Sequence, residues 1–166
     1  MLTSSFLVFF TFIASLVSAA TLYRGDGRGP KAINDAGGFY ARGNHDDHEK
    51  YEATVFQHVT KSLKRPNKDP FISTSTDPAE AAKQGGNKYL YTINSDEIEE
   101  NINDVAAMYE AENKVYPYPN EKEFAVEYHI PLQAITKVEK FVDGQWKSIK
   151  LSKRGLELFD KDVFVN

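Results

Sequence analysis

The amino-acid sequence predicts an α+β fold with a mainly antiparallel sheet. Short segments that alternate apolar and polar side chains, as strands do, are separated by short helix-like segments and by turns rich in Gly, Pro and Asp. Asp143-Gly144 lies between two strand-like segments, which is typical of a type I′ hairpin. The 166 residues contain no internal repeat and no Pro/Gly/Ser-rich linker, so we expect one folded domain.

The first half of the chain predicts one strand and two helices. Residues 21–24 form a short strand-like segment. Residues 30–36 predict a brief helix, because proline suits its first position and Gly37 stands just past its end. Residues 46–63 carry the strongest helix signal, a four-residue recurrence of apolar side chains at Tyr51, Val55, Val59 and Leu63.

The second half predicts mostly strands. Residues 71–75 are strand-like, and Thr76 is placed to cap a short helix that begins at Asp77-Pro78 and ends at Gly85-Gly86. Further strand signals follow at 88–93, 123–128, 136–142 and 145–151.

Charge and composition exclude several kinds of site. The formal net charge is −4 and the isoelectric point about 5.6, so the chain lacks the basic excess of a nucleic-acid-binding protein. Cysteine is absent, which excludes disulfides, thiolate metal sites and cysteine nucleophiles.

The N-terminus predicts export. Residues 2–20 carry no charge, an apolar stretch covers residues 6–17, and small residues follow it, as at a signal-peptide cleavage site. A membrane anchor is the alternative, but the apolar stretch is shorter than the roughly 20 residues of a spanning helix. We therefore expect residues 1–19 to be a cleaved signal peptide and residues 20–166 to form the secreted domain, without a membrane span.

The first candidate site residue is Arg24, at the end of the first strand segment. Gly25, Gly27 and Gly29 follow it, and glycines allow a ligand to approach the backbone closely. The planar guanidinium group of arginine suits a phosphate. An ordinary surface cation is the alternative.

The second candidate is the segment Phe71-Ile72-Ser73-Thr74-Ser75. In a strand Ser73 and Ser75 share one face and Thr74 lies on the other, so the two serines can hold a polar ligand. The alternative is a strand that leads into a helix cap, in which these hydroxyl side chains bind no ligand.

The third candidate is the pair Glu121 and Glu123. On an extended chain two residues at this spacing project to the same side, so one site would receive two acids for different tasks. Solvated surface carboxylates are the alternative.

Together and in this order, these segments resemble the arginine–serine–glutamate class of mono-ADP-ribosyltransferases, most closely the catalytic A subunits of the cholera toxin and heat-labile enterotoxin family. Residues 22–30 resemble the family's YRxDxRxP segment, and residues 71–75 its STS strand. Residues 37–43 resemble its GG…RG loop, residues 101–105 its NxNDV stretch, and residues 121–131 its ExE…IP segment. The resemblance covers residues 22–142.

The resemblance implies an ADP-ribosyltransferase-like fold, in which two small antiparallel sheets flanked by short helices form a cleft for NAD. The enzyme would transfer ADP-ribose from NAD to an arginine of a target protein and release nicotinamide, with some NAD hydrolysis. Arg24, Tyr23 and Asp26 would bind NAD, and Ser73 would orient the nicotinamide side. Glu123 would stabilise the ribosyl cation and Glu121 would serve the acceptor.

The family's active-site histidine has its counterpart in His58, in the predicted 46–63 helix; a helix histidine without a role is the alternative. His45-Asp46-Asp47-His48 could suggest a metal, but such a polar run suits a helix start, so we expect no metal site.

The chain departs from the family pattern in two respects. Without cysteine, no disulfide-linked toxin B pentamer is expected. An insertion that includes Tyr116-Pro117-Tyr118-Pro119 changes the loop before Glu121, so the target protein cannot be inherited from the family. A secreted binding module that kept the fold and lost turnover is the alternative function.

Overall fold

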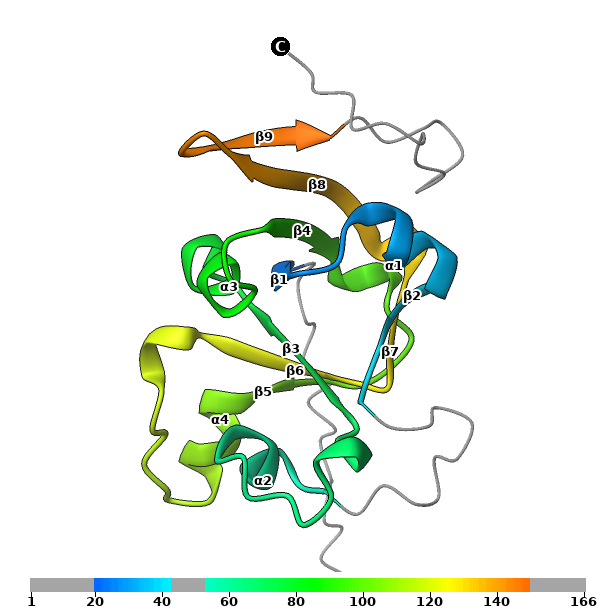
Figure 1. Cartoon of the computed structure of the whole chain (residues 1–166). Coiled ribbons are helices and arrows are strands. Elements are labelled where there is room, and N and C mark those ends of the chain that lie inside the picture. Colours follow the sequence, from blue (N-terminus) through cyan, green and yellow to red (C-terminus); the bar gives the residue numbers. More distant parts are fainter. Residues whose placement is uncertain (1–19, 43–52, 150–166) are drawn as a thin grey trace, which may run out of the picture.

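The computed structural model describes residues 20–42 and 53–149. Their strands pair antiparallel throughout, in a seven-stranded sheet of order β5-β6-β3-β1-β4-β8-β9 and a two-stranded sheet β2-β7. The predicted α+β class is confirmed (Figure 1).

The strands are β1 (Thr21–Asp26), β2 (Gly38–Tyr40), β3 (Phe71–Ser75), β4 (Tyr89–Asn94), β5 (Ile102–Asp104), β6 (Glu123–Glu127), β7 (His129–Pro131), β8 (Ile135–Val142) and β9 (Gln145–Ile149). The helices are α1 (Pro30–Ala36), α2 (Val55–Val59), α3 (Pro78–Gln84) and α4 (Val105–Ala111), with 3-10 turns η2 (Pro66–Lys68), η3 (Ser95–Glu97), η4 (Pro119–Glu121) and η5 (Leu132–Ala134).

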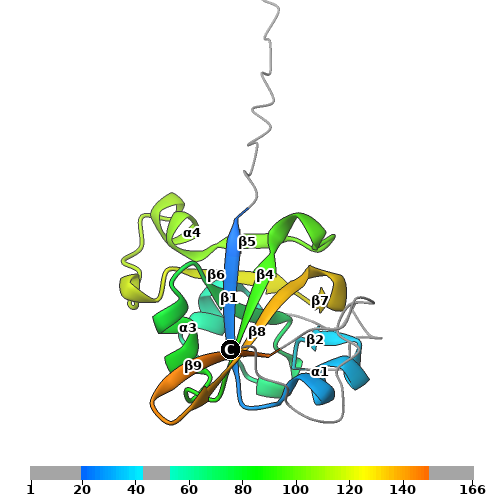
Figure 2. The same cartoon turned by 90° about the horizontal axis from the view of Figure 1, so that it is seen from above.

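The large sheet is divided into two leaves. Strand β1 pairs with β4 over its whole length, but its register with β3 is a single residue pair, Tyr23 with Ser75. We call β5, β6 and β3 the first leaf and β1, β4, β8 and β9 the second leaf. The strands β1 and β4 run across the direction of β5 and β6 (Figure 2), so the two leaves meet at an angled seam.

Three groups of buried side chains hold the elements together. The largest core lies between the second leaf and the small sheet and includes Leu22, Phe39 and Tyr91, each with no exposed surface. A second group packs α2 and α4 against the first leaf, and a third packs α3 against β1 and β4. No helix in the described ranges is long and apolar enough to cross a lipid bilayer.

The long helix predicted over residues 46–63 is wrong where the structure describes it. Helix α2 has five residues and begins after Thr54, whose side chain accepts the amide of Gln57 while the Gln57 side chain accepts the amide of Thr54. Lys61 adopts a left-handed backbone conformation (φ 53°), which a continuing helix cannot accommodate. The apolar recurrence at Val55 and Val59 therefore marks a single buried turn; residues 46–52 lie outside the described residues.

Two other local predictions are confirmed, and the predicted cap of α3 is corrected. Helix α1 has the predicted bounds, and Gly37 ends it in the left-handed conformation (φ 81°). Asp143 and Gly144 both have positive φ between β8 and β9, as a type I′ turn requires. Helix α3 begins at Pro78, but its cap is Asp77 rather than Thr76, because the Asp77 carboxylate accepts the amides of Ala79 and Glu80.

The role predicted for Gly25 is wrong. Strand β1 continues through Gly25 to Asp26, and a Cβ atom on Gly25 would overlap the carbonyl oxygen of Ala81. A Cβ atom on Gly85 would in turn overlap the backbone of Gly25. The backbone that comes close to β1 here is the end of the protein's own helix α3.

Gly25→Ala is expected to destabilise the fold by at least about 2 kcal/mol, because the added methyl meets backbone atoms that cannot rotate away. Urea unfolding followed by the fluorescence of Trp146, the single tryptophan, measures the change. Gly27→Ala is the matched control: no atom lies within 4 Å of its added Cβ, so it should change stability by less than about 0.5 kcal/mol. Equal effects at both positions would contradict the packing argument.

Candidate active site

Four polar side chains meet at the first leaf, with His58 of α2 in the centre. The Nδ1 atom of His58 lies 2.7 Å from a carboxylate oxygen of Asp69. Its Nε2 atom lies 2.9 Å from the Ser73 hydroxyl and 3.2 Å from the carboxylate of Glu123. The predicted residues His58, Ser73 and Glu123 are thus in direct contact.

The strand register explains this meeting. In the β3–β6 pair Ser75 lies opposite Glu123 and Ser73 opposite Ala125, so Ser73 and Glu123 are diagonal neighbours. Asp69 lies just before β3, where its second carboxylate oxygen accepts the amide of Phe71. Glu123 and Asp69 are 6% and 8% exposed, so both acids are largely removed from water.

The hydrogen bonds set the charges of the cluster. Burial alone would lower the pKa of His58, but the hydrogen bonds and charges of Asp69 and Glu123 outweigh it and raise the pKa to about 9. Burial alone would raise the pKa of Glu123, but hydrogen bonds from His58 and Ser73 hold it below its usual value. At neutral pH an imidazolium therefore lies between two carboxylates, and both ring nitrogens donate.

The charged state of His58 predicts a loss of stability in alkaline solution. Because its pKa is higher in the folded protein than in the unfolded chain, its contribution is complete below pH about 6.5 and is lost as the pH rises through 9. We expect the free energy of unfolding to fall by on the order of 3 kcal/mol over this interval. Urea unfolding at pH about 6.5 and at pH about 9 measures this change in the free energy of unfolding. In His58→Gln the change should be largely absent. Parallel curves for the two proteins would contradict the assignment.

Arg24 reaches the cluster from the second leaf. Its Nη1 atom donates to the carbonyl oxygen of Ser73 at 2.8 Å, and its Nη2 atom lies 3.3 Å from Asp26. Its Nε atom is buried without a hydrogen-bond partner among the described residues. Burial lowers the pKa of Arg24, and the nearby Arg28 and Arg42 lower it further. An unpaired donor among three arginines suits an anionic ligand.

Asp26 holds the arginines in place. Its carboxylate accepts the backbone amide, Nε and Nη2 of Arg28 at 2.8–2.9 Å, besides its contact with Arg24. Burial alone would raise the pKa of Asp26, but the hydrogen bonds of Arg28 and the charges of both arginines lower it. Asp26 thus orients Arg24 and Arg28. Both of its carboxylate oxygens are engaged by these arginines rather than left for a ligand.

Tyr23 is not brought to the cluster. Its side chain packs with Ala81, Ala82 and Leu90 under α3, on the opposite face of β1 from Arg24.

The extended chain predicted for Glu121 and Glu123 is wrong. Glu121 ends the turn η4, Lys122 is left-handed (φ 45°), and only Glu123 belongs to β6. The Glu121 carboxylate accepts a hydrogen bond from Gln84 at 2.8 Å, and the Ser75 hydroxyl binds the Glu121 carbonyl oxygen. Burial and the charge of Glu123 raise the pKa of Glu121, which suits a group that accepts a proton.

Sequence reasoning did not single out Asp69 and Tyr116 as site residues. Asp69 is an isolated acid before a strand, and its contact with His58 is what makes it part of the site. The Tyr116 hydroxyl, from the loop after α4, lies 3.4 Å from the second carboxylate oxygen of Glu123, and its ring lies beside that of Tyr109.

The described residues contain no cluster of three His, Asp or Glu side chains arranged for a metal ion. The segment His45-Asp46-Asp47-His48 lies outside them.

Comparisons with known proteins show which family the chain resembles. The family model for the heat-labile enterotoxin alpha chain matches residues 3–166. Heat-labile enterotoxin IIA, A chain, of Escherichia coli is 30% identical over 141 residues, which are 78% of this chain and 52% of that protein. The chain thus spans about half the length of this curated relative.

Solved structures share the fold. A variant of heat-labile enterotoxin superposes with a TM-score of 0.57 at 23% identity, covering 81% of this chain and 71% of the other. A guanine-specific ADP-ribosyltransferase gives 0.55 at 22% identity (80% and 72%), and the scabin toxin of Streptomyces scabies in complex with NADH gives 0.55 at 23% (76% and 67%).

Proposed function

The chain belongs to the heat-labile enterotoxin alpha chain family, and from this premise we propose that it transfers ADP-ribose from NAD to an arginine of a target protein. One observation carries the proposal: Arg24 binds the main chain of Ser73, while the side chain of Ser73 and that of Glu123 meet at His58. The arginine, serine and glutamate of the resemblance thus converge from three strands.

The residues present fit NAD. The unpaired Nε of Arg24 and the half-exposed guanidinium of Arg28 offer donors for an anionic pyrophosphate. Glu123 offers an ionised, buried carboxylate to the ribose. In the proposed reaction the bond from ribose to nicotinamide breaks, its electron pair leaves with nicotinamide, and the ribosyl carbon becomes cationic. Glu123 stabilises this charge, as carboxylates do in glycoside hydrolysis.

The remaining side chains keep Glu123 ionised and remove a proton from the acceptor. His58 and Ser73 hydrogen-bond to Glu123 and keep it ionised, while Asp69 holds His58. Glu121 takes the proton that the guanidinium nitrogen of the acceptor loses as it bonds to the ribosyl carbon.

Glu121→Gln tests the arginine acceptor. The variant should lower transfer to agmatine, a small guanidinium compound, by 10²-fold or more, while slow hydrolysis of NAD by water stays within about tenfold. Labelled agmatine measures transfer and nicotinamide release measures cleavage of NAD. Glu112→Gln, at an exposed acid that ends α4, is the control and should change neither rate. An equal loss of both activities in Glu121→Gln would show that this residue does not serve the acceptor. Absence of nicotinamide release in the parent protein would favour an inactive binding module instead.

We also propose that the protein is secreted after removal of residues 1–19. N-terminal sequencing of the exported protein tests this, with Ala20 as the expected first residue.

A further inference from the structure

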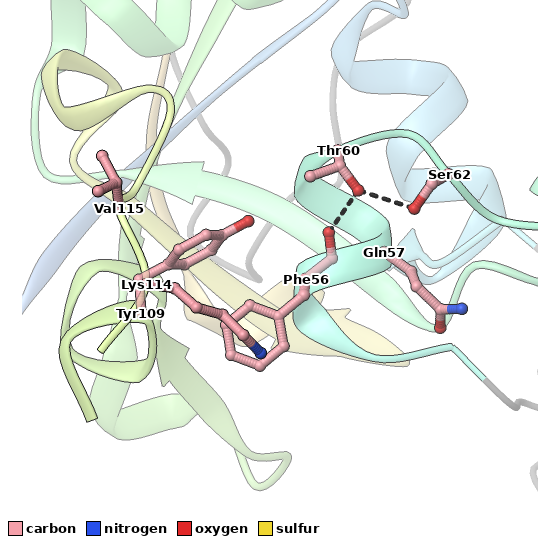
Figure 3. Close-up of a pocket in the computed structure, with 7 residues that line it drawn as sticks. All are labelled: Phe56, Gln57, Thr60, Ser62, Tyr109, Lys114 and Val115. Atoms are coloured by element: carbon pink, nitrogen blue, oxygen red, sulfur yellow. Dashed lines mark hydrogen bonds between the residues drawn. The ribbon is translucent and has the colours of Figure 1, made fainter. Parts of the chain in front are cut away.

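A pocket of about 330 Å³ lies between α2 and the end of α4 (Figure 3). Phe56 and Gln57 of α2, with Thr60 and Ser62 just after it, line one side, and Tyr109 of α4 with Lys114 and Val115 of the following loop line the other. The ring of Tyr109 lies beside that of Tyr116, whose hydroxyl contacts Glu123. The pocket is therefore one aromatic ring away from the proposed site of the reaction.

The lining has features of a binding site. Tyr109 is 5% exposed, and its hydroxyl has no hydrogen-bond partner among the described residues. A buried hydroxyl is normally paired, so this one is an exception among the described residues. Val115 is 90% exposed at the rim, and the Nζ atom of Lys114 lies 3.9 Å from the centroid of the Phe56 ring. The pocket thus offers apolar surface and one cation, Lys114, whose Nζ atom also lies 3.5 Å from the Glu112 carboxylate.

Three exposed cations lie within or just after the segment 60–62 that lines one side of the pocket. Lys61 stands between the lining residues Thr60 and Ser62, and Lys64 and Arg65 follow. All three are exposed, and none forms an ion pair with a residue of the described ranges. This local excess contrasts with the formal net charge of −4 for the whole chain. We call the pocket together with Lys61, Lys64 and Arg65 the α2–α4 surface.

The pocket lies close to the proposed reaction site. The Tyr109 ring that lines it lies 5.2 Å from the Tyr116 ring, whose hydroxyl contacts Glu123. In addition, the charge of Lys61 opposes the rise that burial and the charge of Glu123 cause in the pKa of Glu121. A protein bound at the pocket would therefore have neighbouring residues near Tyr116 and Glu123.

We propose that the α2–α4 surface docks the acceptor protein, by pairing Lys61, Lys64 and Arg65 with an acidic segment and by taking one apolar side chain of that segment into the pocket. This rests on the proposed function and adds the class of partner. The cations complement an acidic segment, and a protein is favoured over nucleic acid because Lys114 covers the Phe56 ring against which a base would stack.

Two synthetic peptides test the proposal. Both carry one arginine and one leucine. In the first peptide these two residues are flanked by glutamates, and in the second they are flanked by glutamines. The full chain should modify the glutamate peptide with a kcat/KM about tenfold higher than the glutamine peptide, and added salt should remove the difference. Fluorescence anisotropy of the glutamate peptide with its arginine replaced by glutamine measures docking without any transfer.

Exposed residues supply the variants. Lys64→Glu/Arg65→Glu should remove both the preference and the binding of the labelled peptide, and Val115→Asp should weaken both, while agmatine is modified at the parental rate. Lys88→Glu/Lys137→Glu makes the same change of charge at exposed positions beside β4 and on β8, and should alter nothing.

Equal use of the two peptides, or a preference that survives Lys64→Glu/Arg65→Glu, would overturn the proposal, as would modification of an oligonucleotide in place of the peptides. Modification of neither peptide nor agmatine, with NAD still cleaved, would refute the arginine acceptor. Docking would then be decided by anisotropy alone: binding that the double variant abolishes supports it, and no binding overturns it.

Discussion

Replacing Glu123 with Gln is expected to lower both NAD hydrolysis and transfer to agmatine by 10²–10³-fold or more. Both reactions pass through a positively charged ribosyl group in the proposed scheme, and the substitution removes the negative charge that stabilises it. The carboxylate is 6% exposed, so water cannot replace it. Nicotinamide release and labelled agmatine, measured on the same preparations, give both rates.

The control for Glu123 is Tyr116→Phe. It removes a long hydrogen bond of 3.4 Å to the same carboxylate but leaves the charge and the contact with His58. Its rates should stay within about tenfold of the parent. A loss in Glu123→Gln that is confined to transfer, or that is no larger than that of Tyr116→Phe, would contradict the role of Glu123. Trp146 fluorescence establishes that both variants are folded.

Arg24→Lys is expected to lower kcat/KM for NAD by about 10²-fold although the charge is kept. The guanidinium group of Arg24 donates to Ser73 and contacts Asp26 through two nitrogens, and its third nitrogen remains for the ligand. A lysine ammonium cannot reach the three directions at once. The loss should therefore include a lower kcat, because Ser73 loses its link to β1, as well as a higher KM for NAD.

Arg28→Lys is the matched control for Arg24→Lys. Arg28 shares Asp26 with Arg24, but its side chain is 48% exposed and does not contact Ser73. Its substitution should cost less than about tenfold. If Arg24→Lys left the rate and the apparent affinity for NAD within about twofold, the proposed anion site would be wrong.

The parts of the fold that could be predicted depend on near neighbours in the chain. Pro30 and Gly37 define α1 from both ends, and Asp143-Gly144 defines the last hairpin, because each acts through its own backbone conformation. The helix α2 was predicted far too long, since apolar spacing does not reveal that Thr54 begins the helix or that Lys61 turns away from it.

The residues of the candidate site likewise differ in whether a sequence motif could reveal them. Arg24, Ser73, His58 and Glu123 were found through motifs, and the structure brings them together. Asp69 carries no motif, and its role depends on a contact with a residue eleven positions away. The close approach of Gly25 and Gly85 likewise joins segments that no local pattern relates.

The seam between the two leaves links substrate binding to the rigidity of the protein. A single residue pair, Tyr23 with Ser75, and the bond from Arg24 to Ser73 fasten β1 to β3. A dinucleotide held by Arg24 on one leaf and Glu123 on the other would hold the two leaves together as well, and its binding free energy would add to the stability of the folded protein. The protein would then be least stable without NAD and would gain stability as the concentration of NAD rises.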